Sequence, residues 1–267
     1  MVKMAVAGAA GRMGSRITAL SREYKGLQLA GAFERKGHKD IGKDIGIITG
    51  IGETGVKLVD SFESIMKNAD VIVSFTTVEA SLAHLKAAAS KGKAMVIGTT
   101  GFTKDDLREV SKLTRKIPCV MASNMSMGVN LLLKILQDIA KALGEGYDIE
   151  IIEAHHRMKK DAPSGTALKM AQVIADALKR NLDEVAVYAR KGIIGERTAK
   201  EIGIQSIRAG DIVGEHTVIF GGLGERIEIT HKVSSRDTFA RGALRAALWV
   251  ANKPAGLYDM QDVLGLK

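Results

Sequence analysis

A chain of 267 residues with 46% hydrophobic and 26% charged residues has the composition of a globular protein, which excludes a disordered or membrane-embedded one. Its single cysteine excludes an internal disulfide, and no apolar run approaches the roughly 20 residues of a membrane helix. Because the start also lacks a secretion signal, a cytoplasmic location without a membrane partner is expected. The formal net charge is +9, and residues 1–126 supply +7 of it, as 19 Lys and Arg against 12 Asp and Glu. These charges are dispersed and only 4% of residues are aromatic, so nucleic-acid binding is not expected.

The first half of the chain alternates short β-rich runs with helical patterns. The predicted strands are 2–7, 27–33, 69–75, 94–99 and 117–122, and the predicted helices follow residue 11 and span 78–90 and 103–116. Strands that alternate with helices of this length form parallel, right-handed βαβ units. We therefore expect an α/β fold in which residues 1–126 form a Rossmann-type, doubly wound parallel sheet that binds a dinucleotide.

The pattern changes near residue 127. A long apolar helix is predicted at 128–143 and a second helix at 164–180, with strands at 147–153, 204–208, 216–220 and 226–232. Several strands with one dominant helix predict an α+β domain at 127–235, for substrate binding and oligomerisation. One face of its sheet would be covered by helix, and an oligomer partner could cover the other. The last helix, 238–250, is expected to pack on the first domain, so that 236–267 completes it.

Three glycines, Gly8, Gly11 and Gly14, separate the first strand from the first helix. Glycine permits the tight turn and the close approach of a pyrophosphate, whose charge the helix N-terminus favours. Glu34 follows Gly14 by 20 residues, where an acid can bond the ribose of NAD, whereas Arg35 could pair with the 2′-phosphate of NADP. The turn thus predicts a site for both NADH and NADPH, although a turn without a ligand has the same glycine pattern. The loops at 75–77 and 98–101 also follow strands and would lie on the ligand side of the sheet.

Residues 153–166 combine two histidines with several cations at the end of a predicted strand. A histidine can transfer a proton near neutral pH, and Lys159 and Lys160 would favour an acidic substrate. The helix that begins near Ser164 offers backbone N–H groups to a carboxylate. A metal site is not expected, because adjacent histidines point apart and the cations would repel a divalent ion. The alternative is a solvated basic loop with a structural histidine.

Five motifs together resemble the 4-hydroxy-tetrahydrodipicolinate reductase family, and the resemblance covers essentially the whole chain. They are Gly-Ala-Ala-Gly-Arg-Met-Gly at 8–14, Val-Ile-Gly-Thr-Thr-Gly-Phe at 96–102, Asn-Met-Ser-Met-Gly-Val-Asn at 124–130, Glu-Ala-His-His-Arg-Met-Lys-Lys-Asp-Ala-Pro-Ser-Gly-Thr at 153–166, and Arg-Ala-Gly-Asp-Ile-Val-Gly-Glu-His at 208–216. The resemblance implies NADH- or NADPH-dependent reduction of 4-hydroxy-tetrahydrodipicolinate to tetrahydrodipicolinate with loss of water, in lysine and diaminopimelate biosynthesis. It also implies a homotetramer joined through the sheet of the second domain.

The resemblance assigns roles by position. His155 and Lys159 match the catalytic proton donors, and the substrate-contacting positions fall on His156, Gly165 and Thr166. The implied cofactor positions are Gly8, Ala9, Ala10, Gly11, Arg12, Met13, Glu34, Arg35, Gly98, Thr99, Thr100, Ala122, Ser123, Asn124 and Met125. Met158 departs from the family, in which many members carry histidine.

Two other functions remain open from the residues. One is a reductase of another small anionic substrate of amino-acid metabolism. The other is an NAD(P)-binding sensor without catalysis, against which the group around His155 and Lys159 argues, because a sensor needs no proton donor.

Overall fold

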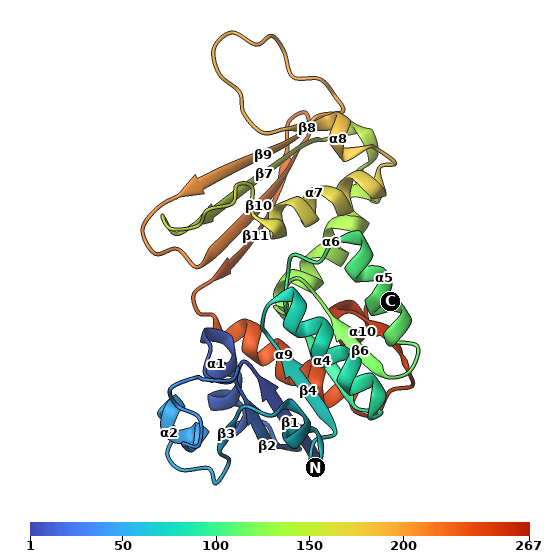
Figure 1. The fold of residues 1–267 in the computed structure, drawn as a ribbon. Helices are drawn as coiled ribbons and strands as arrows, with labels where there is room; N and C mark the ends of the chain where they lie inside the picture. The colour runs from blue at the N-terminus through green and yellow to red at the C-terminus, as the bar shows by residue number, and fades with distance from the viewer. The chain divides into compact units, whose positions relative to one another are not determined.

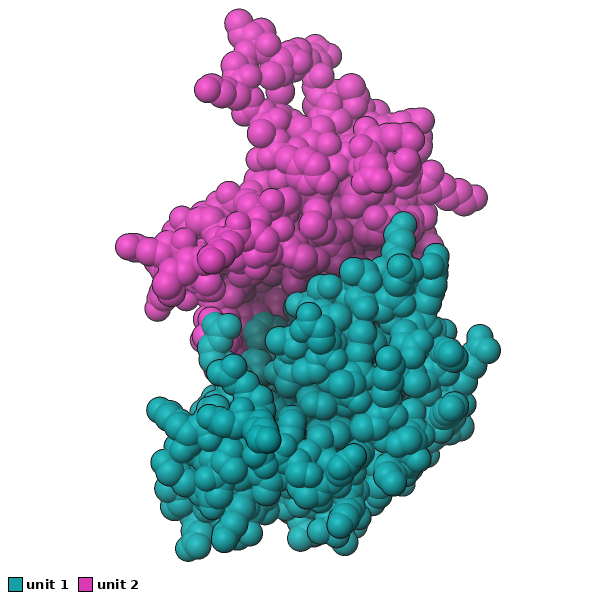
Figure 2. Space-filling model, viewed as in Figure 1, with its two compact units in different colours: residues 1–127, 237–267 teal, residues 128–236 magenta.

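The computed structural model describes all 267 residues, and these form two compact units (Figure 1, Figure 2). Unit 1 comprises residues 1–127 and 237–267, and unit 2 comprises residues 128–236. The boundaries expected from the sequence lie one residue earlier in the chain. None of the helices is long and apolar enough to cross a membrane.

Unit 1 is built on a seven-stranded parallel sheet with the strand order β12-β6-β5-β4-β1-β2-β3. Its strands are β1 Val2–Ala7, β2 Leu27–Phe33, β3 Leu58–Val59, β4 Val71–Ser74, β5 Ala94–Ile97, β6 Pro118–Met121 and β12 Gly256–Tyr258. Its helices are α1 Arg12–Ser21, α2 Ile45–Thr49, α3 Phe62–Met66, α4 Val78–Ser90, α5 Lys104–Leu113, α9 Asp237–Val250 and α10 Met260–Leu264. This sheet confirms the predicted doubly wound α/β fold.

The strands of this sheet are buried on both faces, as their nearly continuous apolar sequences require. Successive residues of a strand point to opposite faces. Met4 and Val6 accordingly join a core formed with α1, α9 and α10, while Ala5 and Ala7 join a second core formed with α3, α4 and α5. Helix α9 therefore packs on unit 1, as predicted from its sequence.

Unit 2 is built on a five-stranded mixed sheet with the order β11-β10-β7-β9-β8. Strand β10 pairs antiparallel with β7 and β11, whereas β9 pairs parallel with β7 and β8. The strands are β7 Asp148–His155, β8 Ala186–Val187, β9 Ile202–Arg208, β10 Gly214–Gly221 and β11 Arg226–Val233. The helices are α6 Met127–Leu143, α7 Gly165–Ala177 and α8 Leu182–Val185, with a 3₁₀ turn at Gly144–Gly146.

One face of this sheet is covered by helices α6 and α7 (Figure 1). Ile149 and Ile151 of β7 pack there among the residues of the second unit's core. Because side chains alternate along a strand, Glu153 and His155 fall on the same covered face, beyond the end of the apolar core. The opposite face is more exposed, and Ile207 on β9 is 47% exposed there.

Candidate active site

A pocket of about 250 Å³ lies at the carboxyl ends of the strands in unit 1. It is lined by residues that follow β1, β4 and β5, and β1 and β4 are adjacent strands at the point where the strand order reverses. Ligands of open parallel sheets bind at this switch point. The lining residues are Arg12, Met13, Phe75, Thr76, Gly98, Thr99 and Thr100. Five of the fifteen predicted cofactor positions thus line one pocket, together with two residues from the loop predicted at 75–77.

The glycine turn beside this pocket depends on close backbone contacts. Gly8 has φ +73°, which L side chains rarely adopt, and a Cβ at Gly14 would fall 2.0 Å from the carbonyl oxygen of Gly8. Gly11 is the N-cap of α1 and has no side chain to cap the first turn. The N–H groups of that turn are therefore presented to an anion, together with the positive end of the helix dipole.

Hydroxyl groups connect the two loops that line the pocket. The Ser81 hydroxyl lies 2.7 Å from the Thr99 hydroxyl and 3.0 Å from the Thr76 hydroxyl, and the Thr76 backbone N–H donates to Thr99 Oγ1 at 3.1 Å. The ring of Phe75 packs on Gly98, where a Cβ would lie 2.1 Å from a ring carbon. These contacts hold the loops after β4 and β5 in one arrangement.

The remaining predicted cofactor positions do not line this pocket. Gly8 and Ala9 donate their N–H groups to the Phe33 carbonyl, at 3.0 Å each. Glu34 and Arg35 follow β2, and Glu34 accepts a bond from the Arg35 N–H at 3.1 Å. Residues 122–125 follow β6, where Met125 is buried in the core of unit 1. All of them follow the carboxyl ends of strands.

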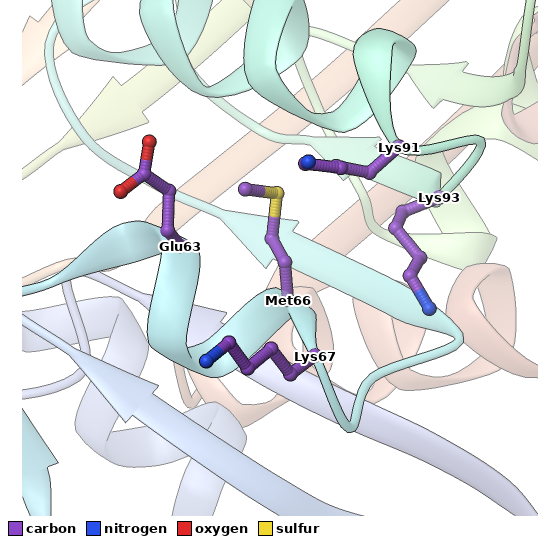
Figure 3. A pocket seen from close by; sticks show the side chains of 5 residues that line it. All are labelled: Glu63, Met66, Lys67, Lys91 and Lys93. Carbon is purple, nitrogen blue, oxygen red and sulfur yellow. The ribbon is translucent and has the colours of Figure 1, made fainter.

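A second pocket in unit 1 has a larger volume, about 400 Å³, but it lies near the amino ends of the strands and not near their carboxyl ends (Figure 3). Glu63, Met66, Lys67, Lys91 and Lys93 line it. The loops that carry its lysines lead into the amino ends of β4 and β5. Because ligands of such sheets bind at the carboxyl ends, this pocket is not the candidate site.

The predicted proton donor His155 is the last residue of β7 in unit 2, and a buried carboxylate holds its ring. Glu153 is fully buried, and its Oε2 lies 2.5 Å from His155 Nδ1. Arg208 on β9 donates two bonds to the same carboxylate, at 2.8 and 2.7 Å. The Ser164 backbone N–H donates to Glu153 Oε1 at 3.1 Å. One carboxylate therefore contacts the histidine, the arginine and the start of α7.

Burial and charge act in opposite directions on this group. Burial disfavours the charged form of Glu153, but the bonds from Arg208 and His155 outweigh it and lower the pKa of Glu153 to about 2. Burial lowers the pKa of His155, and the Glu153 carboxylate offsets part of that shift. Glu153 is thus ionised at neutral pH, and it accepts the proton on His155 Nδ1. This bond leaves Nε2 as the ring atom available for proton exchange.

The other predicted residues of this site lie between β7 and the start of α7. Lys159 Nζ pairs with Asp161 at 2.9 Å, and the Lys159 side chain is half-buried whereas that of Asp161 is exposed. His156 donates its backbone N–H to the Ile212 carbonyl, and its Nδ1 is buried without a partner. Gly165 begins α7, and no atom lies within 4 Å of where its Cβ would be.

Three residues of this cluster, Glu153, Arg208 and His216, received no role from the sequence. His216 on β10 lies 3.1 Å from the Ser164 hydroxyl, and its ring packs edge-on against that of His155. Burial lowers the pKa of His216 to about 4, so this histidine is neutral. The sequence did contain an indication for Glu153. It follows Ile149 and Ile151 at every second position of the strand, so it falls on the same buried face, and a buried carboxylate must have a partner. No group of three metal-ligating side chains is present in the structure.

Two family models match the chain and together cover most of it. The model described as dihydrodipicolinate reductase, N-terminus, matches residues 2–125, and the one described as dihydrodipicolinate reductase, C-terminus, matches residues 128–264.

Full-length relatives point to the same family. Proteins from Syntrophobacter fumaroxidans and Geobacter sulfurreducens, both named 4-hydroxy-tetrahydrodipicolinate reductase, are 60% and 55% identical over 100% of both chains. Among solved structures, a dipicolinate-bound dihydrodipicolinate reductase from Paenisporosarcina sp. TG-14 superimposes with a TM-score of 0.74 at 25% identity, over 98% of both chains.

Proposed function

The chain belongs to the dihydrodipicolinate reductase family, and we propose that it reduces 4-hydroxy-tetrahydrodipicolinate to tetrahydrodipicolinate with loss of water, a step of lysine and diaminopimelate biosynthesis. The observation that carries this proposal is the arrangement around His155. His155, which a buried carboxylate holds at Nδ1, ends strand β7, and the loop that follows carries Lys159 and leads to the start of α7. A proton donor, a cation and a helix N-terminus suit a reaction on a small dicarboxylate.

The residues of unit 1 fit a nicotinamide dinucleotide. The uncapped first turn of α1, with Arg12 beside it, suits the pyrophosphate. The space at Gly14 is already filled by the Gly8 carbonyl, so the helix approaches the strand as closely as glycine allows. Glu34 and Arg35 follow β2, where they can bind the ribose or its 2′-phosphate, so we propose that both NADH and NADPH are used. When bound, the reduced nicotinamide supplies the hydride that reaches C4 of the substrate.

The chain's own residues supply the protons and hold the substrate. We assign His155 Nε2 as a proton donor, because Nδ1 is committed to Glu153. Lys159 is the second donor, and its pairing with the exposed Asp161 is weak enough to exchange for a substrate carboxylate. His156, Gly165 and Thr166 contact the substrate, whose other carboxylate is stabilised by the N-terminus of α7.

We also propose that unit 2 joins four copies of the chain through the exposed face of its sheet. Ile207 on that face is 47% exposed, and Ile193 and Ile194, in the loop between β8 and β9, are 105% and 56% exposed. Arg190 and Arg197 both pair with Glu150 and so fix the two ends of that loop. Apolar side chains presented in this way are typical of surfaces that are covered on association. The oligomeric state is measured by light scattering, for which the proposal requires the mass of a tetramer.

The proposed activity is tested by following NADH or NADPH oxidation at 340 nm with freshly made product of the preceding synthase as the substrate. Substrate-dependent oxidation with both nicotinamides is expected. If the protein binds NADH in calorimetry but turns over neither nicotinamide, it is a sensor and the proposal is wrong. If it oxidises NADH only with other carbonyl or imine acids, the substrate is wrong.

A further inference from the structure

We propose that Glu153 and Arg208 are positioning residues that fix His155 with Nε2 toward the substrate and join it to the start of α7. This inference rests on the proposed function and assigns a role to two residues outside the predicted site. Neither residue touches the reacting atoms. They act through His155.

The geometry around Glu153 is that of a fully satisfied buried ion. Its carboxylate is 0% exposed and accepts bonds from His155 Nδ1, from both terminal nitrogens of Arg208 and from the Ser164 N–H. A buried carboxylate with this many donors cannot turn without losing several charge-assisted bonds. The ring of His155 is held by the same bond that fixes which nitrogen carries its proton.

Arg208 extends the same framework to the rest of the site. One of its terminal nitrogens also donates to the Asp161 carbonyl at 2.6 Å, and Asp161 is the partner of Lys159. The strands add to this, because His155 and Arg208 are paired positions of β7 and β9. Glu153 and Arg208 thereby connect both proposed proton donors with the helix N-terminus that is proposed to bind a carboxylate.

The titratable groups that face His155 lie on β7, β9 and β10 and in the loop after β7, and the charged ones predict opposite effects for two substitutions. Glu153 on β7 favours the protonated ring, whereas Arg208 on β9 and Lys159 in the following loop disfavour it. His216 on β10 is neutral above pH 4 or so. Removing the charge of Glu153 therefore lowers the pKa of His155 further, and removing the charge of Arg208 raises it.

The test compares Glu153→Gln and Arg208→Gln with Glu23→Gln as a control. Glu23 also pairs with an arginine, Arg241, at 2.8 Å, but it lies in unit 1 and belongs to neither the proposed site nor the proposed oligomer surface. The pH dependence of kcat/KM is measured for each, and the pKa of His155 is read from its Cε1–H resonance, assigned by its loss in His155→Gln.

A proton donor loses activity as pH rises through its pKa, so the alkaline limb of the kcat/KM profile, on which activity falls with rising pH, reports the pKa of His155. In Glu153→Gln we expect kcat to fall by about tenfold or more, and we expect the alkaline limb to move to lower pH by about one unit. In Arg208→Gln the alkaline limb moves to higher pH, and in Glu23→Gln it stays in place. The pKa of His155 that is read from its Cε1–H resonance moves in the same directions.

Different results contradict this inference and the proposed function. If the alkaline limb moves in the same direction in both variants, or if a folded Glu153→Gln protein has the alkaline limb of the wild type, the positioning role is overturned. If Glu153→Gln fails to fold, an unshifted or downward limb in Arg208→Gln overturns it alone. If the wild-type protein has no activity but the His155 resonance shifts as expected, the proposed function fails while the coupling of Glu153 to His155 is retained.

Discussion

The close contact at Gly14 leads to a prediction whose size follows from one distance. In Gly14→Ala the new Cβ would lie 2.0 Å from the Gly8 carbonyl oxygen, whereas real Cβ atoms stay at least 3.0 Å from such an atom. Helix α1 or the turn must therefore move by at least 1.0 Å, the difference between these distances. Ile17 and Leu20 of α1 are buried in the core, so the helix cannot move without disturbing packing. Overpacking of this kind costs about 1–3 kcal/mol of unfolding free energy.

The same displacement moves the N–H groups of the first turn away from the proposed pyrophosphate. We expect the Kd for NADH to rise at least tenfold, which corresponds to about 1.4 kcal/mol. Urea unfolding and fluorescence titration with NADH measure the two effects. Gly146→Ala is the control, because no atom lies near its Cβ position and its φ is not positive. A Gly14→Ala protein with wild-type NADH affinity and a stability change below about 0.5 kcal/mol would refute this interpretation of the turn.

Three further predictions concern other parts of the chain. His155→Ala and Lys159→Ala are each expected to lower kcat by about 10²-fold or more, and Lys159→Ala also raises KM. Met158→Ala is expected to change both parameters little. Steady-state kinetics of the three variants test this, and a wild-type kcat in His155→Ala or Lys159→Ala would mean that the proton donors are other residues. Glu34→Ala improves kcat/KM with NADPH relative to NADH, because it removes a charge that repels a 2′-phosphate; an unchanged ratio contradicts the role of Glu34. His84 is a buried residue of α4, and burial lowers its pKa to about 4. The stability that the neutral ring contributes is therefore present above pH 6.5 and is lost as pH falls toward 4. Urea unfolding at pH 7 and pH 4.5 is expected to show a loss of unfolding free energy in the wild type that is smaller in His84→Phe.

The longer elements of the fold were predictable because their signals are local. Strand β2 and helix α4 have the bounds expected from the sequence. Residue 103, where the third helix of the first half was expected to start, is the N-cap of α5, and Thr103 forms a capping box with Asp106. The elements that were not predicted are short, such as α2, α3, β3, β12 and α10, none longer than five residues. An element of that length has too few residues to show a helical or strand period.

The candidate site could be predicted only in part, because the sequence reveals residue types but not pairings across strands. The expected strand at 147–153 ended before His155, whereas β7 includes His155 as its last residue. That extension pairs His155 with Arg208 on β9 and places His155 on the covered face beside Glu153. Glu153 and Arg208 are 55 residues apart in the chain, and no local pattern indicates that they meet.

The most direct test of the account is hydride transfer measured by mass. NADPH carrying deuterium at C4 of the nicotinamide, in each of its two stereochemical forms, is incubated with the protein and freshly made 4-hydroxy-tetrahydrodipicolinate. The account predicts that one of the two forms yields tetrahydrodipicolinate heavier by one mass unit, together with one oxidised nicotinamide for each product formed. Product without deuterium from either form, or no product from a folded protein, would contradict it.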